Sequence, residues 1–382
     1  MIFIINSGSS TLKFRMFDEK LKELGGGIVE RVGEVRSFIE CKIGGEDVKR
    51  TFAGGLADHE RALREVLALL ADFGFDMRDV SAVGHRVVHG GESFVRPTLV
   101  TPEVLKQLRK YDRLAPLHNP ANLMGIEAAK AVLPKAKQVA VFDTAFHSTI
   151  PAYAHMYALP WRWYEKYGIR KYGFHGISHQ YVSEEAAKKL RRPLSQINLV
   201  TCHIGSGASV TAVEGGKSVD TSMGFTPLQG VVMATRCGDI DPSIPLYMIK
   251  EAGRAPDDVY DDLNHESGLF GLTGCSDMRE IMSILGYDYP GFSPKKRPSK
   301  EDKDRARLAV DTFCYSIAKY IGAYAGILGD VDAVVFTAGI GERNAVIRKR
   351  IMSMVKLDPK PKALVIPTNE ELMIAREVAG LG

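Results

Sequence analysis

The sequence predicts an α/β protein made of two related domains. The main observation is a repeated pattern: an apolar strand, a Gly/Ser loop and a second apolar run occupy residues 2–14 and again residues 198–213. The glycines at the centres of these loops, Gly8 and Gly205, lie about half of the 382-residue chain apart. Strand patterns also alternate with helical patterns along most of the chain, which is typical of α/β folds. We therefore expect two copies of one structural unit.

The first domain is expected to cover residues 1–148. It begins with strand patterns separated by glycine turns at 25–27 and 44–45. Leu63, Val66 and Leu70 then recur at helical spacing and predict the first helix. The same criteria predict strands at 80–88 and 138–142, and helices at 58–72, 102–111 and 122–132.

The second domain is expected to cover residues 149–367. A proline-rich basic segment at 290–300 is interpreted as an exposed loop. Ser299 then begins a Ser-x-x-Asp capping box before a long helix that ends near residue 328. The last helix is expected to pack back on the first domain, so that residues 368–382 belong to it. The other expected elements are strands at 197–203, 218–220 and 333–337, and helices at 244–252 and 370–378.

Composition limits the class of protein. Apolar residues make up 45% and charged residues 25% of the sequence, as in ordinary globular proteins. A net charge of +4 is too small to indicate nucleic-acid binding, and no apolar run reaches the roughly 20 residues of a membrane helix. The five cysteines are scattered and never form a CxxC pair, which favours reduced thiols. We expect a cytoplasmic protein without a nucleic-acid or membrane partner.

Three turns rich in small residues, at 6–10, 203–207 and 339–341, each follow a β-branched strand. Such turns present backbone N–H groups to phosphate oxygens, and Lys13 adds an ammonium close to the first turn. The first two turns are equally compatible with ordinary hairpins. The P-loop-like segment 216–218 lacks the earlier glycine of a true P-loop, and the patterns GxGxxG and GxSxG are absent from the sequence. We expect a nucleotide site of another kind.

Basic side chains near strand ends indicate an anionic ligand. Arg86 lies in the segment GHRVVHGGE at 84–92, and eight of the ten histidines fall within residues 85–203. An arginine fork grips a carboxylate or a phosphate in two places. Zinc binding is a weaker alternative, because no motif supplies a third ligand and HExxH is absent. It would rest on the two histidine pairs with helical spacing, His85/His89 and His175/His179.

Two further residues leave alternatives open. Asp143 directly follows a buried strand pattern, where a carboxylate suits Mg²⁺ or a proton relay, or caps the next helix. Arg236 stands between apolar stretches. It would either balance phosphoryl charge or form an internal salt bridge with Asp239.

With these segments in view, the chain closely resembles the acetate kinase family, within the acetate and sugar kinase/Hsp70/actin superfamily. The resemblance implies two duplicated ribonuclease H-like/actin-like ATPase domains around a central cleft. It also implies a homodimer and reversible transfer of the γ-phosphoryl group of ATP to acetate, with Mg²⁺ or Mn²⁺, giving acetyl phosphate and ADP. The matching motifs run in order along nearly the whole chain: INSGSSTLKF (5–14), GHRVVHGG (84–91), FDTAFH (142–147), YGFHGISH (172–179), CHIGSGAS (202–209), DTSMGFTPLQG (220–230), TRCGDIDP (235–242), FTAGIGE (336–342) and TNEELMIARE (368–377).

The resemblance implies roles for individual residues. Asn6 and Glu370 would hold the metal, and Arg86 would bind the carboxylate substrate. The catalytic residues would be Asp143, His175, Arg236 and His118. The methyl pocket would comprise Val88, Leu117, Phe174 and Pro227. The nucleotide contacts would be Lys13, His203, Ile204, Gly205, Ser206, Gly207, Asp277, Met278, Arg279, Gly339, Ile340, Gly341, Glu342 and Arg343.

The chemistry of this reaction favours some of these roles. Acetate is already a nucleophile at neutral pH, so catalysis should consist mainly of positioning and of neutralising phosphoryl charge. Arg236, His175 and the metal are therefore expected to contribute most. Asp143 acts either as a base or as an organiser of metal and water.

The chain departs from the family pattern at four positions. We expect altered nucleotide affinity rather than lost activity, because backbone N–H groups supply much of such binding. Three other functions stay open: a kinase for propionate or butyrate, a pyrophosphate-dependent kinase, and an actin-like or Hsp70-like ATPase module. The departures are Ser206 in place of Asn, Cys237 in place of Ser, Ala338 in place of Gly and Arg343 in place of Asn.

Overall fold

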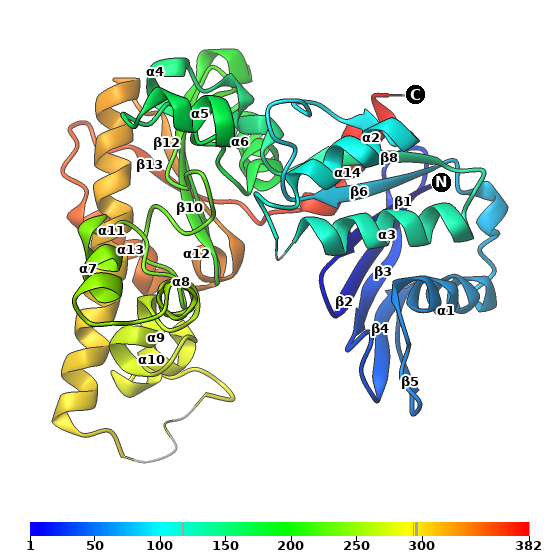
Figure 1. Ribbon diagram of the computed structural model, residues 1–382, viewed down its shortest axis with the longest axis horizontal. Helices are drawn as coiled ribbons and strands as arrows, with labels where there is room; N and C mark the ends of the chain where they lie inside the picture. Colours follow the sequence, from blue (N-terminus) through cyan, green and yellow to red (C-terminus); the bar gives the residue numbers. More distant parts are fainter. Residues whose placement is uncertain (117, 293, 295–296, 382) are drawn as a thin grey trace. The chain divides into compact units, whose positions relative to one another are not determined.

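The computed structural model describes the whole chain apart from residues 117, 293, 295–296 and 382. It divides into two compact units (Figure 1). Unit 1 comprises Met1–Ser148 together with Asn369–Gly382, and unit 2 comprises Thr149–Thr368. Among the described residues, no helix is both long and apolar enough to cross a membrane. The five cysteines are all free thiols.

Unit 1 is built on an eight-stranded sheet with the order β5-β4-β3-β2-β1-β6-β8-β7. The central strand β1 is antiparallel to β2 and parallel to β6, which in turn is parallel to β8. The strands are β1 (Ile2–Ser7), β2 (Thr11–Phe17), β3 (Glu23–Glu30), β4 (Ser37–Ile43), β5 (Glu46–Phe52), β6 (Ala82–Val87), β7 (Thr98–Leu99) and β8 (Lys137–Phe142). The helices are α1 (His59–Asp72), α2 (Pro102–Leu108), α3 (Asn119–Val132) and α14 (Glu370–Ala379).

Helices α3 and α14 cover opposite faces of the sheet of unit 1 (Figure 1). Successive side chains of a strand point to opposite faces. A Cβ at Gly125 of α3 would lie 2.7 Å from Cβ of Ser7, on one face of β1. A Cβ at Gly84 would lie 2.8 Å from Ile4, Ile374 and Val378 (side-chain atoms), on the other face. Glycine at position 84 is therefore what lets α14 approach β6 closely.

Unit 2 contains a five-stranded sheet with the order β11-β10-β9-β12-β13. Its central strand β9 is antiparallel to β10 and parallel to β12, as β1 is to β2 and β6. Five strands of the first sheet, β3-β2-β1-β6-β8, thus have the same topology as the second sheet, which is the duplication that the repeated pattern predicted. The strands are β9 (Asn198–Ile204), β10 (Ala208–Glu214), β11 (Lys217–Thr221), β12 (Ala333–Thr337) and β13 (Lys362–Val365).

Helices α6 and α11 pack on the sheet of unit 2, α6 on β9 and β12 and α11 on β9 and β10. The capping box of α11 is confirmed: Ser299 Oγ accepts a hydrogen bond from the backbone N–H of Asp302, and the carboxylate of Asp302 accepts one from the backbone N–H of Ser299. The helices of unit 2 are α4 (Ala152–His155), α5 (Trp161–Tyr167), α6 (Gly176–Leu190), α7 (Ser243–Lys250), α8 (Pro256–His265), α9 (Gly268–Thr273), α10 (Met278–Ile284), α11 (Lys300–Leu328), α12 (Ala338–Arg343) and α13 (Ala345–Met354).

Candidate active site

The two Gly/Ser loops are both hairpin turns, and each lies at the carboxyl end of a central strand. In unit 1 the backbone N–H of Gly8 donates to the carbonyl of Thr11 at 2.8 Å. In unit 2 the backbone N–H of Gly205 donates to the carbonyl of Gly207 at 3.0 Å. The hairpin and the phosphate-loop interpretations of the sequence therefore do not exclude one another. Ligands of open α/β sheets gather at this edge.

Asn122, a residue that the sequence analysis did not select, ties strand ends of unit 1 together. Its Nδ2 donates to the carbonyl of Ser7 at 2.8 Å, and its Oδ1 accepts from the backbone N–H of Val88 at 3.0 Å. Val88 itself is half-buried directly after β6. His118 is the N-cap residue of α3. Leu117 lies outside the described residues.

Arg86 is the centre of a charged group in unit 1. Its Nε and Nη2 donate to Oδ2 of Asp143 at 3.1 and 2.6 Å, and its Nη1 lies 3.4 Å from Oε2 of Glu370. Asp143 follows β8, and Glu370 is the first residue of α14. The helix-cap alternative for Asp143 finds no support here, because its Oδ2 is bonded to Arg86 and its Oδ1 has no hydrogen-bond partner among the described residues. The side chains of Arg86 and Asp143, both selected from the sequence, are thus in contact at the carboxyl ends of β6 and β8.

Burial and charge shift the pKa values of this group. The side chain of Asp143 is only 2% exposed. Burial and, to a lesser extent, the neighbouring charge of Glu370 raise its pKa to about 6, although Arg86 opposes the shift. Burial lowers the pKa of Arg86, but the charges of Asp143 and Glu370 outweigh that effect and raise it above its ordinary value.

Asn6 and Lys13 lie at the hairpin of unit 1, opposite each other in the register of β1 and β2. Lys13 is exposed and Asn6 is half-buried. Asn6 has the same parity along β1 as Ile4, so its side chain belongs to the face that α14 covers. Glu370 begins α14 on that face.

In unit 2, His175 and Arg236 converge on the loop of the second hairpin. A Cβ at Gly207 would lie 3.4 Å from Nη1 of Arg236 and 3.5 Å from Nε2 of His175. The ring of His175 stacks on that of His203 with 4.1 Å between centroids. His175 also adopts a left-handed backbone, with φ of 57°, an unusual conformation for a non-glycine residue.

Arg236 has no ion-pair partner within the described part of the chain. Its Nη1 donates to the carbonyl of Pro227 at 3.3 Å. Asp239 instead accepts from Gly230 N at 3.0 Å and from the hydroxyl of Tyr320 at 2.6 Å, so the expected alternative of an Arg236–Asp239 salt bridge is wrong. Burial lowers the pKa of Arg236. A half-buried guanidinium without a carboxylate is suited to bind an anionic ligand.

A pocket of about 560 Å³ opens beside this loop in unit 2. Arg279 stands in it over the ring of Phe292 at 4.0 Å, while its guanidinium is held by Asp277. The prediction of an exposed loop at 290–300 is therefore wrong for Phe292. Eight predicted nucleotide contacts line the pocket: Gly205, Ser206, Asp277, Met278, Arg279, Gly339, Ile340 and Arg343. It is also lined by Ala234, Ser276, Tyr289, Pro290, Phe292 and Asn344, which the sequence analysis did not select.

The other predicted nucleotide residues of unit 2 are not part of the lining of this pocket. The carboxylate of Glu342 accepts hydrogen bonds from the backbone N–H groups of Ala338 and Thr368 at 2.8 and 3.1 Å, which fixes the turn into α12. A Cβ at Gly341 would lie 3.5 Å from Cβ of Ile204. Ile204 and Phe174 are buried.

The histidine pairs considered for zinc make hydrogen bonds to other side chains. Nε2 of His85 lies 2.8 Å from Oε1 of Gln138, and Nδ1 and Nε2 of His179 lie 2.8 and 2.7 Å from Thr201 Oγ1 and Ser209 Oγ. In the described residues, no group of three or more His, Cys, Asp or Glu side chains is placed to hold a metal.

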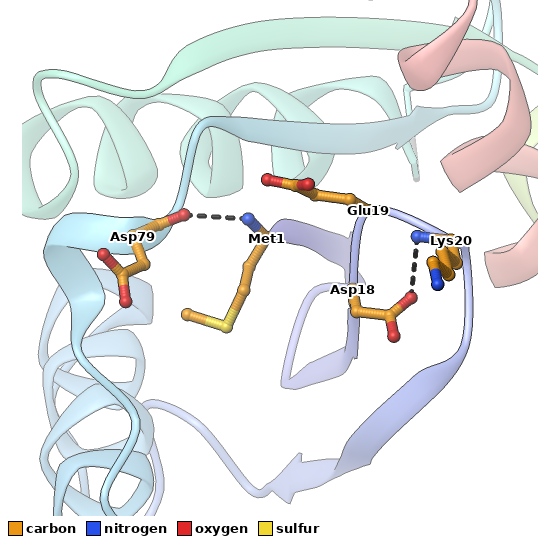
Figure 2. A pocket seen from close by; sticks show the side chains of 5 residues that line it. All are labelled: Met1, Asp18, Glu19, Lys20 and Asp79. Atoms are coloured by element: carbon orange, nitrogen blue, oxygen red, sulfur yellow. Dashed lines mark hydrogen bonds between the residues drawn. The ribbon is translucent and has the colours of Figure 1, made fainter.

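A second hollow, in unit 1, contains none of the predicted site residues. It is lined by Met1, Asp18, Glu19, Lys20 and Asp79 (Figure 2). The amino group of Met1 donates to the carbonyl of Asp79 at 2.8 Å (Figure 2). This hollow lies at the amino end of β1, opposite to the strand edge where ligands gather.

Comparison with known proteins agrees with the resemblance. The model of the Acetokinase family matches residues 1–359. An acetate kinase of Halothermothrix orenii is 46% identical over 99% of this chain and 98% of its own, and one of Bacillus subtilis is 45% identical over 100% and 99%.

Solved structures agree as well. Porphyromonas gingivalis acetate kinase superposes with a TM-score of 0.89 at 35% identity, covering 100% of this chain and 99% of its own. A propionate kinase of Francisella tularensis gives 0.89 at 37% identity, covering 98% of both. The duplicated ribonuclease H-like/actin-like fold is thus confirmed. The chain belongs to the acetokinase family.

Proposed function

We propose that this protein is a phosphotransferase that moves the γ-phosphoryl group of ATP to acetate, reversibly, giving ADP and acetyl phosphate. The observation that carries this proposal is Arg236, which lies beside His175 at the Gly207 loop and has no carboxylate partner among the described residues. The names of full-length relatives at 45–46% identity support acetate as the acceptor.

Each unit supplies one part of the chemistry. In unit 1, Arg86 binds and orients the carboxylate acceptor, whose oxygen is already nucleophilic at neutral pH. In unit 2, the pocket with Arg279 and Phe292 takes the adenosine of the donor, and Arg236 and His175 stabilise the charge on the equatorial phosphoryl oxygens. This division needs no strong base. Asp143 then orients Arg86 and solvent rather than removing a proton.

We also propose that Mg²⁺ binds with Asn6 and Glu370 as its protein contacts. Both offer oxygen atoms, which hard cations prefer, and both belong to one face of the sheet in unit 1. A site with few protein ligands suits Mg²⁺, which keeps several waters and takes phosphate oxygens as ligands. When bound, the ion would neutralise charge on the donor phosphates. Replacing Glu370 by Gln should raise the Mg²⁺ concentration needed for half-maximal activity.

The proposal also concerns which carboxylic acid is preferred as the acceptor. One methylene in an apolar pocket is worth about 1–3 kcal/mol, so propionate should also be used. The propionate kinase structure at 37% identity keeps that alternative open. Val88→Ala should shift the ratio of activities toward propionate; an unchanged ratio would remove Val88 from the methyl pocket.

We further propose a cytoplasmic homodimer. Large apolar side chains are exposed on α7, α8 and α11, and exposed apolar groups of this kind often mark interfaces. Light scattering should give about twice the mass of one chain. The exposed residues concerned are Ile244, Leu246, Tyr247, Tyr260, Leu308 and Tyr315.

The experiment that tests the function is trapping of acyl phosphate by hydroxylamine over acetate, propionate and butyrate, with ATP or pyrophosphate as the donor. We expect the most hydroxamate with acetate and ATP. Hydroxamate formed with pyrophosphate but not with ATP would identify pyrophosphate as the phosphoryl donor. Absence of hydroxamate with every acid would refute the kinase proposal and leave the ATPase-module alternative.

A further inference from the structure

A row of hydrogen-bonded side chains leads from the interior of unit 2 to His175. Nδ1 of His175 lies 2.9 Å from Oγ of Ser209, Oγ of Ser209 lies 2.7 Å from Nε2 of His179, and Nδ1 of His179 lies 2.8 Å from Oγ1 of Thr201. Thr201 and Ser209 are on β9 and β10, and His179 is on α6. The row thus joins three elements.

Water cannot complete the bonding of these groups. Thr201, Ser209 and His179 are each 0% exposed. The hydroxyls of Thr201 and Ser209 make only the bonds of this row within the described part of the chain. Each hydroxyl carries one proton, and a buried donor that finds no acceptor destabilises the folded protein.

Only one arrangement of protons satisfies both hydroxyls. If Thr201 donates to Nδ1 of His179, then Nε2–H of His179 donates to Ser209, and Ser209 donates to Nδ1 of His175. In the reverse arrangement, His179 donates to Thr201 and the Thr201 proton has no acceptor. If both histidines donate to Ser209, the hydroxyl proton of Ser209 has no acceptor.

We infer that Thr201, His179 and Ser209 form a directional relay that holds His175 in the tautomer with its proton on Nε2. The Nε2 atom is the one that lies with Arg236 Nη1 near the Gly207 loop. His175 therefore presents a hydrogen-bond donor, without needing a positive charge, where an anionic oxygen would bind. The stacked ring of His203 fixes its plane. Thr201, His179 and Ser209 are positioning residues, and their effect on catalysis rests on the proposed function.

A matched pair of variants at Thr201 separates this role from packing. Thr201→Val keeps the shape and removes the hydroxyl, whereas Thr201→Ser keeps the hydroxyl and loses a methyl group. The relay predicts that kcat falls on the order of 10-fold in the valine variant and recovers in the serine variant, with KM values little changed. A packing role predicts the opposite ranking. Thr211→Val is the control, because this buried hydroxyl of the same sheet bonds to Thr221 and not to the histidines.

The tautomer can be measured without any activity. Nitrogen-15 NMR of histidine-labelled protein distinguishes a proton on Nε2 from one on Nδ1. We expect Nε2–H for His175 in the unaltered protein and in the Thr201→Ser variant, and a mixture in the Thr201→Val variant. A His175 that carries its proton on Nδ1, or a spectrum unchanged by Thr201→Val, would overturn the relay. If the protein proved not to be a kinase, the tautomer of His175 measured by NMR would still test the relay.

Discussion

The two units share the same arrangement of five strands, but Arg86 in unit 1 and Arg236 in unit 2 have different bonding partners. In unit 1, Arg86 is bonded to Asp143 and ion-paired with Glu370. In unit 2, Arg236 bonds to a backbone carbonyl and has no carboxylate partner among the described residues. We propose that Arg86, which is paired with carboxylates, orients the substrate, and that Arg236, which is not, leaves its charge for the phosphoryl group. The shared fold sets where the loops lie, and the charges around them set their function.

The largest effect on catalysis should follow removal of Arg236, the arginine without a carboxylate partner among the described residues. Arg236→Ala should lower kcat by roughly 1,000-fold or more, because an arginine that stabilises the transferring phosphoryl group is worth that much. The KM for acetate should change much less. Steady-state kinetics with both substrates checks this.

The control for Arg236 is Arg254→Ala, an exposed arginine paired with Asp262 on α8. It should keep nearly full kcat. If Arg236→Ala raised KM and left kcat unchanged, Arg236 would be a binding group and not a transition-state contact.

Removal of Arg86, the arginine paired with carboxylates, should affect both acceptor binding and stability. Arg86→Ala should raise the KM for acetate at least 10-fold with little change in ATP affinity. It should also lower the free energy of unfolding by about 3 kcal/mol, because it leaves the carboxylates without their cation. Arg15→Ala, which breaks the exposed pair with Glu23, should change stability by well under 1 kcal/mol. Equal losses of acetate and ATP affinity would contradict the assignment.

The raised pKa of Asp143 gives a pH test of the same group. Its pKa of about 6 lies above the ordinary value of 3.8, so the folded state binds this proton more tightly than the unfolded state does. The stabilisation is complete below the ordinary pKa and is lost as the pH rises through about 6.

Asp143→Asn removes this titration. The free energy of unfolding of the unaltered protein, relative to the variant, should therefore fall by a few kcal/mol as the pH rises from about 4 to about 6. Denaturation curves at a series of pH values measure this. A difference that stays constant or grows with pH would show that Arg86 holds Asp143 ionised throughout.

The smallest expected effect concerns the turn after β12. Ala338 has a φ of 62°, a left-handed conformation that costs a residue with a Cβ about 1 kcal/mol. Ala338→Gly should therefore raise the free energy of unfolding by up to about 1 kcal/mol. Ala333→Gly, within β12, should lower it. Thermal unfolding of both variants checks the pair, and destabilisation by Ala338→Gly would refute the strain.

Much of the fold could be predicted because it depends on local pattern. Strand β12 occupies the predicted residues, and α11 begins at its predicted capping box. The start of α3 was predicted three residues late, at Asn122 instead of Asn119. Their side chains bond to backbone groups of distant strand ends.

The site was harder to predict in full because its supporting contacts are distant in sequence. Arg86 and Asp143 carry visible motifs, but their contact with each other depends on the pairing of β6 with β8. Ser209 and Thr201 look like ordinary strand residues until β9, β10 and α6 are assembled. Phe292 was assigned to a solvated loop because proline and basic residues surround it.

Transfer of the phosphoryl group to acetate can be followed directly by phosphorus-31 NMR of the protein with ATP, Mg²⁺ and acetate. We expect resonances of ADP and acetyl phosphate, and their loss in the Arg236→Ala variant while ATP still binds. Formation of ADP and inorganic phosphate without acetyl phosphate would contradict the proposed function, because Arg236 would then serve hydrolysis and not transfer to a carboxylate.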